Sequence, residues 1–580
     1  MARMRTVTLT TKAGEALDDR PWQAYPRPQL RRERWINLNG RWDYAESRSH
    51  PPACYDKTIL VPFCPQSALS GIGHHPDERA TPWLCYRTRF TLPALPEGQS
   101  LLLHCGGVDQ TAVVVCNGKT QGRCTPLLEG GLTIRLDAVR PGENELCLFV
   151  QSDLRDKSIP YGKKTLRRGG MWYTPVSGIW QTVWLEWVPR AHITRLEITP
   201  TLTAARIRVW MTDPAHEAEY PAPEGSLLFA GKRWPLVNGE TELRPAEPHL
   251  WTPEDPHLYA FCVQAGEDQA ESYFALRTVA VQRIGGKLRI VLNGKPVFFH
   301  ALLDQGYWPD GLYTPASPDC YAEDILAAKA LGFNTLRKHI KIEPEQFYYD
   351  CDRLGMLVFQ DFVNNGSYHY IRDTVLPTLG LLHWPERLLM RTKLEKERFL
   401  SHMDATVRRL GNHPCVVYWT IFNEGWGQFD SSACYARLKR LDPTRIIDAT
   451  SGWFFEGKTD VDSRHVYFKP FRVPKTDRPV ILSEFGGYVC KLPAHSFNLD
   501  KTYGYKLFPD EKTMQAALIE KYETEILPAI PQGLCGAVWT QLTDVEDETN
   551  GLLTYDRRVC KPDPGPMQAL AARLAAAIGG

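Results

Sequence analysis

Eight apolar runs alternate with helical patterns from residue 297 onward, and this alternation limits the fold more than any other feature. Eight β–α units in about 285 residues match the number and size of a (β/α)8 TIM barrel. The link between the fifth and sixth runs is irregular. The runs are Val297–Leu303, Phe333–His339, Met356–Phe362, Cys415–Phe422, Arg445–Ala449, His465–Phe468, Val480–Ser483 and Gly536–Gln541; the helical patterns are Ala322–Leu331, Glu345–Leu354, Leu394–Leu410, Thr513–Ile526 and Met567–Ile578.

The first half of the chain has the pattern of β structure. Short runs such as Leu101–His104, Thr111–Cys116 and Gln181–Trp187 are rich in Val, Leu, Trp and Thr, and helical periodicity is scarce before residue 320. Pro189 and a new series of strands after Ile193 mark a boundary, and the next segment of about 90 residues has the size of an immunoglobulin-like sandwich. We therefore expect β-sandwiches over residues 1–189 and 190–285, followed by a TIM barrel over residues 286–580.

Charge and cysteine usage exclude several classes of protein. The chain has 580 residues, with 68 Lys+Arg against 67 Asp+Glu, so its net charge of +1 gives little attraction to nucleic acid or an anionic membrane. No apolar stretch reaches ~18 residues, and no apolar run follows Arg3 and Arg5 as in a secretory signal. The 15 cysteines are scattered and never spaced as Cys-x-x-Cys. We expect a cytoplasmic protein with reduced cysteines and no nucleic-acid or membrane partner; a homo-oligomer stays open.

Two glutamates follow predicted barrel strands. The fourth strand ends at Asn423-Glu424-Gly425, and the seventh ends at Ser483-Glu484-Phe485-Gly486. Catalytic groups of a TIM barrel lie at the carboxyl ends of its strands, so these two carboxylates should face each other across the mouth. One such glutamate could equally be a solvated loop residue, but the pair shares its context. Retaining glycoside hydrolysis uses two carboxyl groups ~5–5.5 Å apart, which favours this chemistry.

These and other motifs resemble glycoside hydrolase family two, the family of β-galactosidases, β-glucuronidases and β-mannosidases. The resemblance covers the chain from about residue 21 to 562, and it implies that the first sandwich is a jelly-roll sugar-binding domain. The motifs that carry it are Arg20-Pro21-Trp22, the run from Trp35 to Trp42, Gly107-Val108-Asp109, Cys116-Asn117-Gly118, Ser177-Gly178-Ile179-Trp180-Gln181, Asn423-Glu424 and Ser483-Glu484-Phe485-Gly486.

The resemblance assigns roles to the two carboxylates. Glu424 is the acid/base that protonates the leaving oxygen, and Glu484 is the nucleophile that attacks the anomeric carbon. Glu424 then has to hold a proton near neutrality, helped by the charge of Glu484 and by apolar walls such as Trp426. Glu484 has to stay ionised, which requires hydrogen-bond donors around it.

Seven further residues are expected at the mouth by the same resemblance. For four of them a structural alternative stays open: a rim salt bridge for Arg337, a structural role for His339, and core packing for Tyr467 and Trp539. The expected roles are a bond to the nucleophile for Arg337 and Tyr467, a bond to the sugar 2-hydroxyl for Asn423, substrate contact for His339, an aromatic floor for Trp539, and hydroxyl binding for Asp304 and Asp153.

The chain departs from the family pattern in two places. Asn365 and Ser367 stand where large β-galactosidases carry magnesium ligands, so we expect no metal site, and no cofactor is implied. The loop after strand eight, residues 548–553, lacks the lysine with which β-glucuronidases pair the sugar carboxylate. The acidic run there should repel a uronate. Its members are Asp544, Glu546, Asp547 and Glu548.

The sequence therefore predicts a retaining exo-β-glycosidase that removes a terminal neutral sugar from an oligosaccharide or glycoside. A β-galactoside is the expected substrate. A β-glucuronidase and a hydrolase of β-galactofuranosides or arabinosides are the alternatives within enzymes. A catalytically silent carbohydrate-binding protein on the same scaffold is the alternative from another class; the presence of both carboxylates argues against it.

Overall fold

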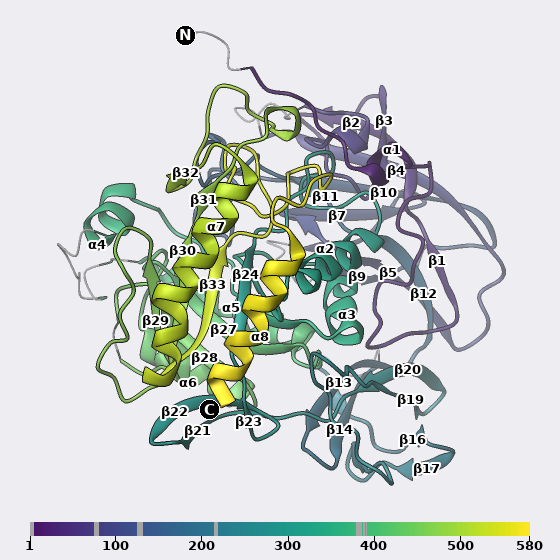
Figure 1. The fold of residues 1–580 in the computed structure, drawn as a ribbon. Helices are drawn as coiled ribbons and strands as arrows, with labels where there is room; N and C mark the ends of the chain where they lie inside the picture. The colour runs from purple at the N-terminus through teal and green to yellow at the C-terminus, as the bar shows by residue number, and fades with distance from the viewer. Residues whose placement is uncertain are drawn as a thin grey trace.

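The computed structural model describes residues 5–74, 81–124, 131–213, 218–378, 386, 389, 391–455 and 457–579. Figure 1 shows the early β sheets on one side of a helix-covered barrel, which occupies the later part of the chain.

Two antiparallel sheets near the N-terminus pack around one hydrophobic core. Their strand orders are β1-β12-β5-β9 and β3-β2-β4-β10-β7-β8. Trp42 and Leu148 from one sheet and Leu103 from the other belong to the same buried cluster. The strands are β1 (Trp35–Asn37), β2 (Gly40–Ser47), β3 (Lys57–Val61), β4 (Trp83–Leu92), β5 (Gln99–Cys105), β7 (Thr111–Cys116), β8 (Lys119–Cys124), β9 (Leu132–Arg135), β10 (Gly142–Gln151) and β12 (Val183–Pro189), with the small pair β6 (Val108–Asp109) and β11 (Gly178–Ile179) beside them.

A second pair of antiparallel sheets follows, with its own core. Ile207, Val263 and Phe274 meet in this core from both sheets. In one sheet β14 lies between β13 and the short strands β15 and β18; the other has the order β17-β16-β19-β20. The strands are β13 (His192–Pro200), β14 (Ala205–Thr212), β15 (Tyr220–Pro221), β16 (Ser226–Phe229), β17 (Lys232–Pro235), β18 (Glu240–Leu243), β19 (Tyr259–Ala265) and β20 (Asp268–Phe274); the sheet β21 (Val279–Ile284), β22 (Lys287–Leu292) and β23 (Lys295–Pro296) then leads into the barrel.

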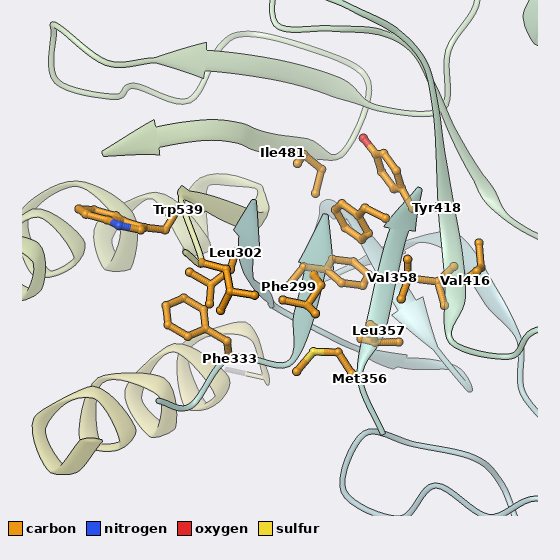
Figure 2. Close-up of a cluster of buried hydrophobic side chains, with 14 of the residues drawn as sticks. Phe299, Leu302, Phe333, Met356, Leu357, Val358, Val416, Tyr418, Ile481 and Trp539 are labelled. Carbon is orange, nitrogen blue, oxygen red and sulfur yellow. The ribbon is translucent and has the colours of Figure 1, made fainter. Parts of the chain in front are cut away.

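Eight parallel strands form a nearly closed barrel in the order β28-β27-β26-β25-β24-β33-β30-β29. The two end strands meet through side chains, because the Oγ atoms of Ser451 and Ser463 lie 3.1 Å apart. Figure 2 shows buried apolar side chains that pack on and beside the barrel strands. The strands are β24 (Phe299–Asp304), β25 (Thr335–Lys338), β26 (Leu357–Asp361), β27 (Val416–Asn423), β28 (Ile446–Ser451), β29 (Asp462–Val466), β30 (Val480–Gly486) and β33 (Leu534–Thr540).

Helices cover most of the barrel, and α7 and α8 lie in front of its strands in Figure 1. The longest, α5 (Lys393–Leu410), begins with a capping box in which Thr392 and Glu395 satisfy each other's backbone N–H groups. Phe399, Met403, Val407 and Leu410 lie on its buried face. The others are α1 (Lys12–Glu15), α2 (Asp319–Ala330), α3 (Glu345–Leu354), α4 (Leu376–Thr378), α6 (Ser431–Leu441), α7 (Glu511–Lys521) and α8 (Pro564–Gly579), with the short helices η1 (Ala68–Ser70), η2 (Ile371–Val375), η4 (Pro493–His495), η5 (Tyr522–Ile526) and η6 (Leu527–Gln532), and the strand pair β31 (Tyr488–Val489) and β32 (Lys506–Leu507).

The predicted barrel is confirmed, including the irregular link between its fifth and sixth strands, where the described residues contain no helix. The sixth strand was misplaced: it covers Asp462–Val466 rather than His465–Phe468. None of the helices in the described part of the chain has the length and hydropathy of a membrane span.

Candidate active site

Glu424 and Glu484 lie close together at the mouth of the barrel. Glu484 belongs to β30 and is 6% exposed; Glu424 directly follows β27. One carboxylate oxygen from each, together with a ring nitrogen of His465, falls within a mutual distance of 4.8 Å. This separation fits the ~5–5.5 Å of retaining glycosidases and not the ~6.5–9.5 Å of inverting ones.

The backbone at Glu424 is unusual. Its φ is 55°, in the left-handed region that side chains other than glycine rarely adopt, and Gly425 follows with a φ of 69°. A Cβ on Gly425 would lie 2.4 Å from the ring of Phe454, so glycine is required there. A non-glycine residue in this conformation is costly and is found mostly at functional sites, where the turn directs the side chain.

Arg337 on β25 connects the residues around the pair and is 1% exposed. Its guanidinium donates to Glu484 Oε1 at 3.2 Å and to Asn423 Oδ1 at 2.8 Å. On its other side Nε lies 3.1 Å from both carboxylate oxygens of Asp361 at the end of β26. Arg337 therefore holds Glu484, Asn423 and Asp361 in fixed positions. A contact from Arg337 to Glu484 was expected from the sequence, whereas its contact to Asn423 was not.

Glu484 is kept ionised by its surroundings. Burial by itself would raise the pKa of Glu484, but the charges of His465, Arg337 and His339 and a hydrogen bond from Tyr467 outweigh it and lower the pKa to about 2. Tyr467 donates to Glu484 Oε2 at 2.6 Å, as predicted, and its hydroxyl also lies 3.0 Å from Thr540 Oγ1. The nucleophile position thus has the donors that the predicted role requires.

We expect Tyr467→Phe to shift the acid side of the pH profile. The tyrosine hydroxyl lowers the pKa of Glu484, so its loss raises that pKa, and the carboxylate becomes protonated at a higher pH. The acid limb of kcat/KM should move up by about one pH unit, because a hydrogen bond to a charged group contributes ~1.5–3 kcal/mol. An acid limb that stays in place would show that Tyr467 does not act on Glu484.

His465 was not predicted as a site residue. Its Nδ1 lies 2.9 Å from Glu424 Oε1, while Nε2 lies 3.2 Å from Ser451 Oγ and 3.6 Å from Glu484 Oε1. The ring therefore lies between the two carboxylates. The sequence carried a signal, since His465 was in the sixth predicted run, but it was taken as the first residue of that strand instead of one near its carboxyl end.

Asp361 is the second residue that the sequence did not identify. Besides Arg337, it accepts from His339 Nδ1 at 2.7 Å. Burial would raise the pKa of Asp361, and the charge of Arg337 and the bond from His339 lower it. The Asp361 carboxylate thereby holds His339 at the barrel mouth, beside the nucleophile.

Two predicted site residues point away from the mouth. Asp304 bonds Lys338 Nζ at 2.5 Å and Gly306 N at 2.9 Å. Side chains alternate along a strand, so Asp304 shares the face of Leu302, which packs in the core beneath the helices. Asp304 therefore belongs to a buried ion cluster with Lys338, and both of its oxygens are already bonded.

Trp539 lies in the outer layer for the same reason. Its neighbour Val538 packs with Ala301 inside the barrel, while Trp539 is fully buried and contacts Phe485 at a ring distance of 5.2 Å and Tyr522 at 6.0 Å. Figure 2 shows it among the buried apolar side chains. Its role as a sugar platform is corrected to barrel packing.

Asp153 is not brought to the pair. It is half-buried, and its Oδ1 accepts from Arg155 Nε and N, both at 3.0 Å. Its backbone is bonded to the side chain of Gln110. These contacts belong to the N-terminal part of the chain, so the structure does not support Asp153 as a hydroxyl-binding residue.

The carboxyl groups of the acidic run after β33 are buried and hydrogen-bonded within the protein, which corrects the expectation that the run meets and repels a uronate. Its side chains are buried, and burial raises the pKa of Asp544 to about 6 and also raises the pKa of Glu546 and Glu548. The bonds are Asp544 to Lys561 Nζ at 2.7 Å, Glu546 to Thr174 N at 2.8 Å, Asp547 to Asn498 Nδ2 at 2.7 Å, and Glu548 to Tyr173 Oη at 2.5 Å and Gln541 Nε2 at 2.9 Å.

A segment between β10 and β11 reaches from the N-terminal sheets onto the barrel mouth. Tyr161 donates from its hydroxyl to Gly366 O at 2.9 Å and from its backbone N to Asn364 O at 3.1 Å. Trp172 packs its ring edge-on against Trp426, two residues after Glu424, at 5.2 Å. This segment forms a wall of the site.

The same segment carries Lys163, which is 8% exposed. Within the described residues no hydrogen bond or ion pair satisfies its ammonium, which lies 5.7 Å from the ring centre of Trp172. Burial lowers the pKa of His339. The hydrogen bond to Asp361 raises this pKa, and the positive charge of Lys163 lowers it further. The charge of Lys163 also opposes the burial that raises the pKa of Glu548. A buried ammonium without a partner is unusual, since buried charges are ordinarily paired.

The only group of three possible metal ligands found in the described part of the chain is Glu424, His465 and Glu484. Arg337 places a permanent positive charge 3.2 Å from Glu484, which opposes a divalent cation there. Asn365 uses its side-chain amide to donate to Ser158 O at 2.8 Å and to Glu395 O at 2.9 Å.

Comparison with known proteins agrees with this barrel. Residues 286–560 match the model of the glycosyl hydrolases family 2 TIM barrel domain. A β-galactosidase of Aeromonas hydrophila is 28% identical over 410 residues, covering 65% of this chain and 37% of the relative. The fold alone is shared with the β-glucuronidase of Ruminococcus gnavus (TM-score 0.71, 17% identity, 96% and 99% of the two chains) and with a GH2 β-galacturonidase of Eisenbergiella tayi (0.67, 18%, 95% and 98%).

The barrel with its paired carboxylates has the architecture of barrel glycosidases. Residues 286–560 belong to the TIM barrel domain of glycoside hydrolase family 2.

Proposed function

We propose that this protein is a retaining exo-β-glycosidase. The observation that carries the proposal is the pair Glu424 and Glu484, with carboxylate oxygens within 4.8 Å at the carboxyl ends of β27 and β30. Glu484 attacks the anomeric carbon while Glu424 gives its proton to the leaving oxygen. Glu424 then takes a proton from water, which releases the sugar with its configuration retained.

The surrounding residues bond the two carboxylates and hold them in position. Arg337 and Tyr467 bond the oxygens of Glu484, so they hold it ionised and fix its direction of attack. His465 forms a hydrogen bond with Glu424 and positions it. Asn423, held by Arg337, is available to the sugar 2-hydroxyl.

We also propose that residues 1–189 form a jelly-roll domain, 190–285 an immunoglobulin-like domain and 286–580 the catalytic barrel.

We infer that the substrate is a β-galactoside. The similarity to β-galactosidases supports this choice, and so does the absence of a lysine from the loop 548–553. The chain spans only 37% of the length of the Aeromonas relative, so the sugar has to be determined on this protein.

One observation favours a second candidate, a glycoside whose sugar carries a carboxylate. Lys163 supplies a buried cation without a partner among the described residues, near His339 and Glu548. The carboxyl groups of the acidic run are already hydrogen-bonded within the protein. A uronate would therefore meet the ammonium of Lys163 and no unbonded carboxylate of the run. A sugar carboxylate bonded to Lys163 would satisfy both charges.

A panel of nitrophenyl glycosides tests the proposal. We expect the β-galactoside to have the highest kcat/KM, unchanged by EDTA, with a single β-configured monosaccharide released first. Lys163→Met should leave it unchanged. If glucuronides or galacturonides are preferred instead, and Lys163→Met lowers their kcat/KM by about 100-fold, the second candidate is correct. Loss of activity with EDTA would contradict the expectation of a metal-free site, and an α product would contradict retention.

A further inference from the structure

Two large apolar side chains next to the active site are strongly exposed. Phe468, which directly follows Tyr467, is 68% exposed, and Leu507 on β32 is 72% exposed. Single exposed apolar residues are common on protein surfaces, but exposed apolar side chains gathered at the rim of a pocket mark binding surfaces.

Ring contacts connect Phe468 to the nucleophile. The hydroxyl of Tyr467 lies 2.6 Å from Glu484 Oε2, and the ring of Tyr467 stacks on Tyr505 at 3.9 Å with an interplanar angle of 26°. Phe468 meets Tyr505 edge-on at 5.2 Å. Phe468 therefore lies two rings away from the nucleophile on a continuous aromatic path.

Backbone hydrogen bonds fix the segment around β32 and hold its apolar side chains in place. Tyr505 N donates to Gly487 O at 2.9 Å and Phe508 N to Val489 O at 2.8 Å, so the chain runs extended between them. A Cβ on Gly487 would lie 2.3 Å from the Tyr505 ring, so glycine at that position leaves room for the ring.

Alternation along this segment separates its two sides. Lys506 and Phe508 point to Tyr488, at 5.4 Å and 5.0 Å. Tyr505 and Leu507 must then point the other way, to the side where Phe468 meets Tyr505.

The apolar face also lies beside the acid/base residue. Tyr505 stacks on Tyr467, which bonds Glu484; in keeping with this place, burial raises the pKa of Tyr505, and Tyr503 and the charges of Glu424 and Glu484 raise it further. Tyr503, 6.2 Å from Tyr505 between ring centres, extends the aromatic surface. The group that leaves from Glu424 emerges at the mouth, where this surface begins.

We propose that Phe468, Tyr505 and Leu507 form a subsite for an apolar or aromatic aglycone, so that the natural substrate is a β-glycoside of such an alcohol or phenol. The inference rests on the proposed glycosidase function and names the class of its leaving group. A sugar as leaving group would need polar partners, and Phe468 and Leu507 offer apolar surface instead.

Benzyl and methyl β-glycosides of the sugar that the panel identifies provide the test. Their alcohols have nearly equal acidity and need the same protonation, so a difference in kcat/KM reports aglycone binding. We expect wild type to prefer the benzyl glycoside by at least about tenfold, or ~1.4 kcal/mol. Phe468→Ala should lower this preference by about tenfold and leave kcat/KM for the methyl glycoside unchanged, while Phe468→Leu should retain most of it.

Val237→Ala is the matched control, since Val237 is 67% exposed but lies in the second pair of sheets. It should leave the preference intact. Equal rates for the benzyl and methyl glycosides in wild type would overturn the aglycone subsite while leaving the glycosidase function standing. A lack of turnover on every glycoside would refute the function itself. If Phe468→Ala changes only the sedimentation behaviour, the face is a contact between copies of the chain and the proposal is wrong.

Discussion

Glu484→Gln is expected to lower kcat for every substrate by about 10⁴-fold or more while the protein stays folded. The amide is nearly isosteric with the carboxylate: its oxygen can accept from Arg337 while its NH2 group donates to the Tyr467 hydroxyl, but it cannot attack the anomeric carbon. Losses of this size are typical when a nucleophile is removed. Steady-state kinetics and circular dichroism of the purified variant measure the two halves of the prediction.

A 2-deoxy-2-fluoro glycoside of the preferred sugar gives an independent check. It should trap the glycosyl-enzyme in wild type and place the label on Glu484, as peptide mass spectrometry can show. A label on Asp361, which is also buried beside Arg337, or on another carboxylate would rule out the assignment.

Glu424→Ala should divide substrates by their leaving groups. Glycosides of poor leaving groups need protonation, so their kcat/KM should fall by about 10²–10⁴-fold, while activated dinitrophenyl glycosides should lose much less in the glycosylation step. External azide should enter the space left by the carboxylate and restore turnover of activated substrates as the glycosyl azide.

His465→Gln serves as the comparison, because it removes the ring that lies 2.9 Å from Glu424 Oε1 and leaves the Glu424 carboxyl group in place. We expect a smaller loss with the same dependence on the leaving group and no rescue by azide. If Glu424→Ala slows good and poor leaving groups equally and azide has no effect, Glu424 is not the acid/base.

The sequence predicted the barrel and its catalytic pair because both depend on local pattern. Apolar runs mark strands buried between the interior and the helices, and the residue that follows each run lies at the mouth. β29 escaped this method because it is largely polar: Ser463 and His465 face the hydrogen-bond network that surrounds the catalytic pair. The search for apolar residues therefore moved the strand three residues along the chain and hid His465 at its start.

The sequence by itself determined the succession of the strands, the helices α2, α3, α5, α7 and α8 but not α6, and the two glutamates at the strand ends, since these follow from the spacing of residues along one chain. Only the tertiary structure decided where each side chain points and what it meets. Trp539 lies on a strand as predicted, and Asp304, expected just after a strand, is the last residue of β24, but the pleat turns both to the outer face. The acidic run was read as free charge because its partners come from distant segments, such as Tyr173. The charge of a side chain and the direction in which it points depend on its neighbours in space, and the spacing of residues along the chain does not reveal those neighbours.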